Sequence, residues 1–448
     1  MNTPHRKKSG LQWTTPPAVS RLLFLCLLIP TATRGQDVRL GGFLQLDKRF
    51  DIGGSDVTIA DFYNRFRFEM NAPLGKQLYV FTSVDFRFYD LSRVRSLVGL
   101  ENLEQGYPTD LSLWESYIDV YDFLVDGLDV RFGKQRLAWG TADKLNPTDN
   151  LNPDDFSDLV NFTEKIPTWA AKVSYYIGDY TITGVWLPSL TPILLPRNSA
   201  SLFLGEQSEA FQSILLLPAP LPRNSMFALK VDGNAGAWDY SLSYFNGYDD
   251  VPILREVNIP VDQTGSASGS LNFGFPRIQV IGLDFATELS GAGFWGEGAL
   301  FFPEEQVSRI NLGRFVSTNI ELAGAPYFKF TVGGDYTFSN GVYLNGQWMH
   351  GFFTERGGDA LHDYFIVELE KKLLKDEIKI SFGAGLEISR WNKIQDNYGY
   401  GLFPKVTYAG VDNLEMTAGV FIAGGKTTTL FGSWNAADQV YTSIKASF

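Results

Sequence analysis

The sequence predicts an all-β protein, a single transmembrane antiparallel β-barrel of about 18 strands. Apolar and polar residues alternate with period two over segments of about ten to fifteen residues, as in strands with two differently solvated faces. The connections between these segments are alternately short and long. The chain has 44 glycines and 15% aromatic residues. Beyond residue 35, no apolar run is long enough for a membrane helix.

Residues 1–35 have the composition of a secretory signal peptide. They contain five Lys or Arg and no Asp or Glu, and residues 22–29 form an apolar run too short to span a bilayer. We expect cleavage before Gln36, so that residues 36–448 form the barrel; the long stretch before the apolar run also allows a later start codon. Cys26, the only cysteine, lies in this run, so the exported chain has no disulfides. A lipoprotein acylated at Cys26 is disfavoured, because no small residues precede it.

Charge narrows the range of partners. Loss of residues 1–35 changes the formal net charge from −12 to −17. Such an acidic chain is not expected to bind nucleic acid without a strong basic patch. No glycine-rich phosphate loop is present, and we expect no cofactor.

The stretch 78–89, LYVFTSVDFRFY, illustrates the alternation, with Val84 and Phe86 on one face and Asp85 and Arg87 on the other. Marking every such segment gives an even number of strands, with boundaries good to a few residues. The predicted strands are 37–49, 59–71, 76–90, 110–122, 127–138, 167–177, 179–188, 224–233, 236–247, 275–288, 292–302, 326–337, 341–352, 361–371, 375–389, 399–409, 412–423 and 436–448.

The connections support closure into a barrel. Turns such as 177–179 and 339–341 are short, whereas 139–166, 189–223 and 303–325 are long. Short periplasmic turns and long extracellular loops are typical of outer-membrane barrels, and closure leaves no unpaired edge. A propeller would show a repeat of about 40 residues, which is not found, and a soluble sandwich rarely has strands so long and aromatic.

Two segments carry a resemblance to a known family. The chain ends QVYTSIKASF, with Val440, Ile444 and Phe448 on one face, and this resembles the signal by which the barrel-assembly machinery recognises Gram-negative outer-membrane proteins. The segment RFGKQRLAWGTADKLNPTDNLNPDDF, 131–156, resembles a motif of porin-like outer-membrane proteins of unassigned substrate, in which R-x-G-x-Q leads into W-G and an Asn-Pro loop. In strand number and in this passage, the chain is similar to alginate-export and other 18-stranded substrate-selective porins.

The resemblance implies an outer-membrane channel, in contact with outer-membrane lipids, for passive or substrate-selective diffusion of a small-molecule solute. The motif covers a small part of the chain, so it supports the class and not a substrate. The alternative is a non-conducting barrel that acts as a surface binding or adhesion module, or that transports a hydrophobic ligand.

Charged residues gather on the polar face of the first five predicted strands, where we expect them to line the pore. Opposite charges facing one another would pair and rigidify the wall; the alternative is a basic track for anionic solutes. Glu368, Glu370 and Glu387 on later strands would give the opposite wall the contrary charge. The predicted pore-lining residues are Arg39, Arg49, Arg65, Arg67, Glu69, Asp85, Arg87, Glu115, Asp119 and Arg131.

The loop 139–166 repeats the order Asn-Pro-x-Asp, which suits two capped helical turns. It lacks the spacing of a calcium loop, although an irregular cation site at Asp149, Asp154 and Asp155 stays open. A loop of this length is usually functional and could fold into the lumen and narrow the pore. Arginines at the narrowest point would favour anions, whereas Asp149 and Asp154 would favour cations. The predicted constriction residues are Asp143, Asn146, Asp149, Asn152, Asp154 and Asp155.

The loop 189–223 predicts a short helix, because Phe203, Ala210, Phe211 and Ile214 have helical spacing. Such a helix would pack on the barrel rim, or would plug the pore or bind an apolar ligand.

Enzyme signals are weak. His350 and His362 flank a loop that also holds Glu355, Asp359 and Asp363. The two histidines differ in strand parity, so we expect neither a shared catalytic or metal site nor an enzyme.

Overall fold

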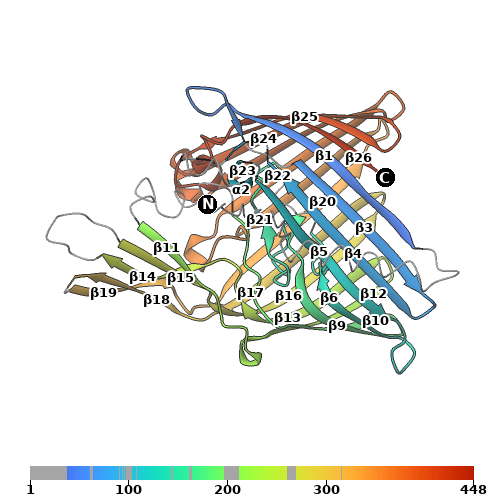
Figure 1. The fold of residues 1–448 in the computed structure, drawn as a ribbon, viewed down its shortest axis with the longest axis horizontal. Helices are drawn as coiled ribbons and strands as arrows, with labels where there is room; N and C mark the ends of the chain where they lie inside the picture. The colour runs from blue at the N-terminus through green and yellow to red at the C-terminus, as the bar shows by residue number, and fades with distance from the viewer. Residues whose placement is uncertain are drawn as a thin grey trace, which may run out of the picture.

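The computed structural model describes residues 38–448 apart from 61–63, 90, 93, 95, 97–102, 107, 143–144, 161–163, 196–210, 260–268 and 314. The predicted signal peptide therefore lies outside the described residues. Nineteen strands form one sheet. The short β2 pairs with β1, and the other 18 close into an antiparallel barrel, because β1 pairs with both β3 and β26 (Figure 1).

All 18 predicted strands are confirmed, with ends displaced by a few residues. The barrel strands are β1 (Arg39–Asp51), β3 (Asn64–Leu74), β4 (Leu78–Phe88), β5 (Thr109–Val120), β6 (Leu128–Gln135), β9 (Thr168–Ile177), β10 (Tyr180–Leu187), β12 (Met226–Ala235), β13 (Trp238–Tyr248), β16 (Arg277–Leu289), β17 (Ala292–Pro303), β20 (Tyr327–Thr337), β21 (Val342–His350), β22 (Asp363–Leu373), β23 (Ile378–Ile388), β24 (Tyr398–Val411), β25 (Leu414–Gly425) and β26 (Gln439–Ser447).

The smaller elements lie in the connections. They are β2 (Thr58–Ala60), β7 (Asp154–Asp155), β8 (Glu164–Lys165), β11 (Phe211–Leu216), β14 (Ile253–Ile259), β15 (Gly269–Gly274), β18 (Gln306–Leu312), β19 (Phe315–Leu322), α2 (Leu103–Gly106), α4 (Leu430–Ser433), η3 (Pro222–Asn224), η4 (Gly358–Ala360) and η5 (Trp391–Asp396). In the described part of the chain, no helix has the length and apolar character needed to cross a membrane.

The alternation places apolar side chains outside and polar ones inside. On β4, Phe86 is exposed on the outer face, whereas Asp85 is completely buried on the inner face. At the C-terminus Val440, Ile444 and Phe448 are all exposed, as their shared parity predicts. An apolar belt around a polar interior is the arrangement that a bilayer requires of a closed barrel.

The long connections lie at the end of the barrel opposite the C-terminus, where a second sheet projects beyond the barrel (Figure 1). Its order is β11-β15-β14-β18-β19. The predicted helix is wrong where the structure describes it, because residues 211–216 form β11 and pair in parallel with β15. Phe203 and Ala210 lie outside the described residues. Long-range pairing has overridden the local helical spacing, as is common for short apolar runs.

The Asn-Pro repeat folds differently from the two helical turns that we predicted. The first copy is one tight turn, in which the Asp149 N–H donates to the Asn146 carbonyl at 3.1 Å. In the second copy Asp154 and Asp155 form β7, which pairs with β8. Asn152 uses its side chain elsewhere, as described below, and so does not cap a helix.

Candidate functional site

The connection between β6 and β9, residues 136–167, folds into the barrel; we name it the lumenal loop. The side chain of Asn152 fixes the two ends of this loop, where the loop leaves β6 and returns to β9. The Asn152 Oδ1 accepts from the Leu137 N–H at 2.6 Å, and its Nδ2 donates to the carbonyls of Gln135 at 3.2 Å and Ile166 at 2.9 Å. One buried amide therefore ties the outgoing and returning ends of the loop together, directing the residues between them inward.

The other residues of the R-x-G-x-Q…W-G motif serve the same geometry. At Gly133 the backbone has a φ of +139° and lies so close to β5 that an added Cβ would be 2.2 Å from the Ser116 carbonyl oxygen; only glycine fits. Gln135 is fully buried and donates to the Ala170 carbonyl at 3.0 Å. Trp139 packs in an apolar cluster with the inner faces of β9, β10, β12, β13, β16, β17 and β20.

On one side the lumenal loop binds Arg49, Arg65, Arg67 and Arg87, which we name the arginine wall. These four side chains come from the adjacent strands β1, β3 and β4. Each one forms an ion pair with a loop carboxylate, and the wall also holds two carboxylates of its own. The pairs are Arg49 with Asp47 (2.9 Å) and Asp158 (2.5 Å), Arg65 with Asp85 and Glu164 (2.8 Å), Arg67 with Asp85 (2.5 Å) and Glu164 (3.2 Å), and Arg87 with Asp155 (3.4 Å).

A β-bulge between β4 and β5 places a tryptophan against the arginine wall. The register of β4 with β5 shifts between Ser83 and Val84, so that Trp114 is the extra residue and is buried. The Arg65 and Arg67 guanidinium carbons lie 4.9 Å from the centre of a Trp114 ring. Cation–π contact with a desolvated tryptophan adds stabilisation of about 2 kcal/mol.

On the other side the loop is anchored to strands far around the barrel. The Thr148 hydroxyl donates to Glu297 of β17 at 2.5 Å, and Thr331 of β20 donates to the Leu145 carbonyl at 3.3 Å. Following the pairings, β17 lies nine strands from β3. Half of an 18-stranded barrel therefore separates the two anchors, and the loop spans the lumen from wall to wall.

Within the loop, the predicted constriction aspartates are also paired. Lys165 lies 2.9 Å from Asp154 and 3.7 Å from Asp149. Burial raises the pKa of the Asp154 carboxyl, which Lys165 partly offsets. Burial alone would lower the pKa of Lys165, but the charges of Asp154 and Asp149 raise it. Asp155 lies beside Arg87, so no three of these carboxylates converge as a cation site would require.

A second charged group borders the loop at the extracellular end. Arg356 forms ion pairs with Asp249 and, at 3.8 Å, with Asp250. Burial, together with the adjacent Asp249 charge, raises the pKa of Asp250 to about 7, against the opposing effect of Arg356. Asp250 therefore changes charge near neutral pH.

Between the lumenal loop and β22–β26 lies a cavity of about 150 Å³, which we name the aromatic cavity. The loop contributes Leu145 and Val160, and α4 contributes Phe431. The Trp434 Nε1–H has no hydrogen-bond partner among the described residues. Glu368 and Lys405, 4.0 Å apart, also line the cavity. Its aromatic side chains are Phe352, Tyr364, Phe403, Phe421, Phe431, Trp434 and Tyr441.

Of the remaining predicted residues, Glu115 also contacts the start of the lumenal loop, whereas the others that the structure describes lie apart from it. Arg131 of β6 pairs with Asp119 of β5 at 2.5 Å; Arg39 is exposed and Glu69 half-buried. Glu115 binds Arg136 at 2.9 Å. Asp143 lies outside the described residues. On β22, Glu370 lies 3.5 Å from Lys379 of β23.

Sequence reasoning missed Asp158, Glu164, Lys165 and Glu297, which anchor the loop. The one feature of the sequence that could have indicated them is their place in the chain, because three of them lie in the second half of the loop that was expected to enter the lumen.

A closed 18-stranded barrel with an apolar outer belt and an inward-folded loop is the fold of outer-membrane porins. No protein-family model matches the sequence, and no curated protein matches it. Among solved structures, Pseudomonas aeruginosa OccK8 (OprE) is similar with a TM-score of 0.51 and 10% identity. P. aeruginosa OpdK with vanillate and a BenF-like porin from Pseudomonas fluorescens Pf-5 each give a TM-score of 0.51 and 8% identity. Each likeness covers 92% of this chain and 98% of the other.

Proposed function

We propose that this protein is a solute-selective outer-membrane channel, in which the lumenal loop forms the constriction and solutes pass beside it through the aromatic cavity. The observation that carries the proposal is the span of the loop from Arg65 to Glu297. On the side of β9–β16, Leu137, Trp139 and Leu151 fill the interior. The cavity on the side of β22–β26 is the space through which a solute would move.

The chemistry of this cavity favours small, flat, amphipathic solutes. Aromatic faces offer stacking surfaces, and the Trp434 Nε1–H would donate to a carboxylate or carbonyl oxygen. Glu368 and Lys405 add one charge of each sign. The OpdK structure was solved with vanillate, an aromatic carboxylate, which makes that compound a suitable probe here.

The arginine wall, in this proposal, is a paired anchor for the loop and not an open anion track. Its four guanidinium groups contact five carboxylates, Asp47, Asp85, Asp155, Asp158 and Glu164. Screening limits the reach of exposed charges to about 8 Å at physiological ionic strength. The nearest paired groups, and not the net charge of the chain, therefore set ion selectivity.

Planar-bilayer recording tests this function. We expect stepwise openings, and block by vanillate at lower concentration than by an aliphatic carboxylate. Trp434→Phe should weaken the vanillate block by roughly twofold to tenfold, the effect of one hydrogen bond. Trp295→Phe is the matched control, because its Nε1–H also lacks a partner among the described residues but does not line the cavity. A silent barrel would favour the binding or adhesion module, and equal block by both carboxylates would remove the aromatic selectivity.

We further propose that Phe448 is the residue by which the barrel-assembly machinery recognises the chain. Its ring is exposed and stacks on the ring of Phe66, with 6.0 Å between the ring centroids, beside the pairing of β1 with β26 that closes the barrel. Phe448→Ala should lower the yield of assembled barrel in the outer membrane and leave detergent-refolded protein conducting.

A further inference from the structure

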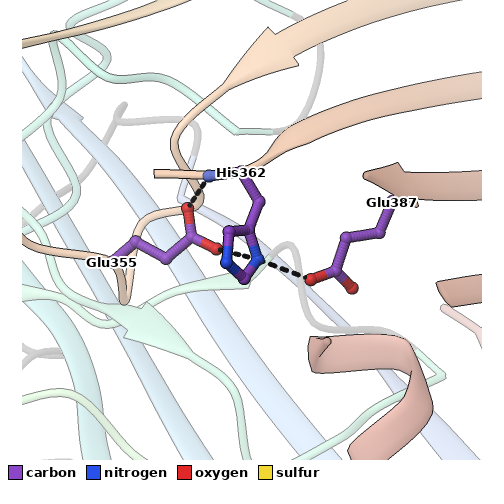
Figure 2. Close-up of side chains that lie close together, drawn as sticks. All are labelled: Glu355, His362 and Glu387. Atoms are coloured by element: carbon purple, nitrogen blue, oxygen red, sulfur yellow. Dashed lines mark hydrogen bonds and ion pairs between the residues drawn. The ribbon is translucent and has the colours of Figure 1, made fainter. Parts of the chain in front are cut away.

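Glu355, His362 and Glu387, which we name the rim cluster, meet at the extracellular mouth of the barrel (Figure 2). Glu355 and His362 come from the connection between β21 and β22, and Glu387 from the end of β23. His350 lies outside this cluster, as its strand parity predicts, and pairs instead with Asp363 at 3.0 Å. The connection between β21 and β22 returns Glu355 to the side of His362, which strand parity does not predict.

We propose that the rim cluster binds a divalent transition-metal ion. The His362 Nδ1 lies 2.8 Å from Glu387 Oε1 and 3.2 Å from Glu355 Oε1. Ligands bound to a tetrahedral zinc ion at about 2.0–2.2 Å are roughly 3.4 Å apart. A small outward movement of each side chain would therefore admit the ion between them.

Backbone hydrogen bonds fix the orientation of both carboxylates. Glu387 Oε2 accepts from the Phe431 N–H at 2.9 Å, and its Oε1, which faces His362, also accepts from the Leu430 N–H at 2.8 Å. Glu355 Oε2 accepts from the N–H groups of Phe352 at 2.8 Å and His362 at 3.0 Å. Such outer-shell contacts fix the direction of metal ligands, and here they leave both Oε1 atoms facing the imidazole.

Charge also favours a cation. Glu387 is fully buried and Glu355 largely so, and burying an uncompensated carboxylate is costly. Within the described ranges, neither forms an ion pair with Lys or Arg. A proton on His362 offsets one negative charge, whereas a divalent ion offsets both.

The donor set suits a borderline ion. One imidazole and two carboxylates are ligands of Zn²⁺ and similar metals, whereas Ca²⁺ and Mg²⁺ prefer oxygen ligands alone. The Tyr364 hydroxyl lies within hydrogen-bond distance of both candidate ligand oxygens, at 2.6 Å from Glu355 Oε1 and 3.3 Å from Glu387 Oε1. Tyr364 also lines the aromatic cavity, so the ion would stiffen the wall of the proposed solute path.

Calorimetric titration of the untagged barrel in detergent with Zn²⁺ tests this site. We expect one bound ion per chain, and no comparable heat with Mg²⁺. His362→Ala and Glu355→Gln should each weaken binding at least as much as the roughly 10- to 100-fold typical of losing an outer-shell partner. His350→Ala should bind as the native protein does, because that histidine faces a single carboxylate.

Heat-modifiable gel migration establishes that each variant is folded. The proposal would be overturned if the native protein did not bind zinc. It would also be overturned if folded His362→Ala and Glu355→Gln variants bound zinc as the native protein does. Conductance does not enter this test, so the metal site and the proposed channel can fail independently.

Discussion

Arg65 of β3 and Glu164 of the lumenal loop form an ion pair of 2.8 Å, and Arg67 reaches the same carboxylate at 3.2 Å. The pair joins a barrel wall to a loop 99 residues further along the chain. It unites two features that the sequence suggested separately, a row of inward arginines and an acidic loop. The positive charge of the arginines and the negative charge of the loop therefore neutralise each other.

This pairing predicts the effect of removing the arginines. In Arg65→Ser/Arg67→Ser/Arg87→Ser, Asp85, Asp155 and Glu164 lose their cations, and the reversal potential should shift toward cation selectivity. Breaking a buried pair costs roughly 3–5 kcal/mol, so Arg87→Ser alone, which breaks only the 3.4 Å pair, provides a milder variant. The triple Arg→Lys variant keeps the charge and should retain the native reversal potential. An unchanged potential in the serine variants would exclude the wall from selectivity.

The barrel could be predicted from the sequence because each strand carries its own signal. Period-two alternation depends on neighbouring residues alone, and it located all 18 strands. The inward orientation of Arg65 and Asp85 followed from the same parity. The partners of the arginines could not be predicted, since Asp158 and Glu164 are brought to the wall by the tertiary path of the loop. The β4–β5 bulge at Trp114 and the strand β11 likewise depend on pairing with distant segments.

The close packing of Gly140 predicts a loss of stability on substitution. A Cβ at this position would lie 2.3 Å from Glu297 Oε2 and 2.7 Å from Thr148 Oγ1, so Gly140→Ala should displace the loop from β17. Overpacking of this kind costs about 1–3 kcal/mol, measurable as a lower temperature for the heat-induced change in gel migration. Gly184→Ala is the control, since no atom of the described residues lies within 4 Å of its added Cβ. Equal melting of the two variants would argue against a tightly seated loop.

Asp250 predicts a pH dependence of stability. Its pKa of about 7 in the folded protein exceeds the ordinary aspartate value of about 3.9, so folding favours the protonated form. The contribution of Asp250 is therefore largest at low pH, and it declines as pH rises from about 4 to 7. Asp250→Asn should remove this decline and make the barrel more stable than the native protein at pH 8. A native and variant protein with parallel stability curves between pH 5 and pH 8 would contradict the assignment.

In the proposed channel, the lumenal loop is held to the arginine wall and forms the narrowest point. Single-channel conductance of Asp158→Asn/Glu164→Gln tests it most directly, because the variant breaks the contacts with Arg49, Arg65 and Arg67 and leaves the wall intact. Asp119→Asn is the control, since Asp119 pairs with Arg131 of the neighbouring strand and not with the lumenal loop. We predict a larger and more variable conductance in the double variant and a native step size in the control. A double variant with the native conductance would contradict a constriction formed by this loop.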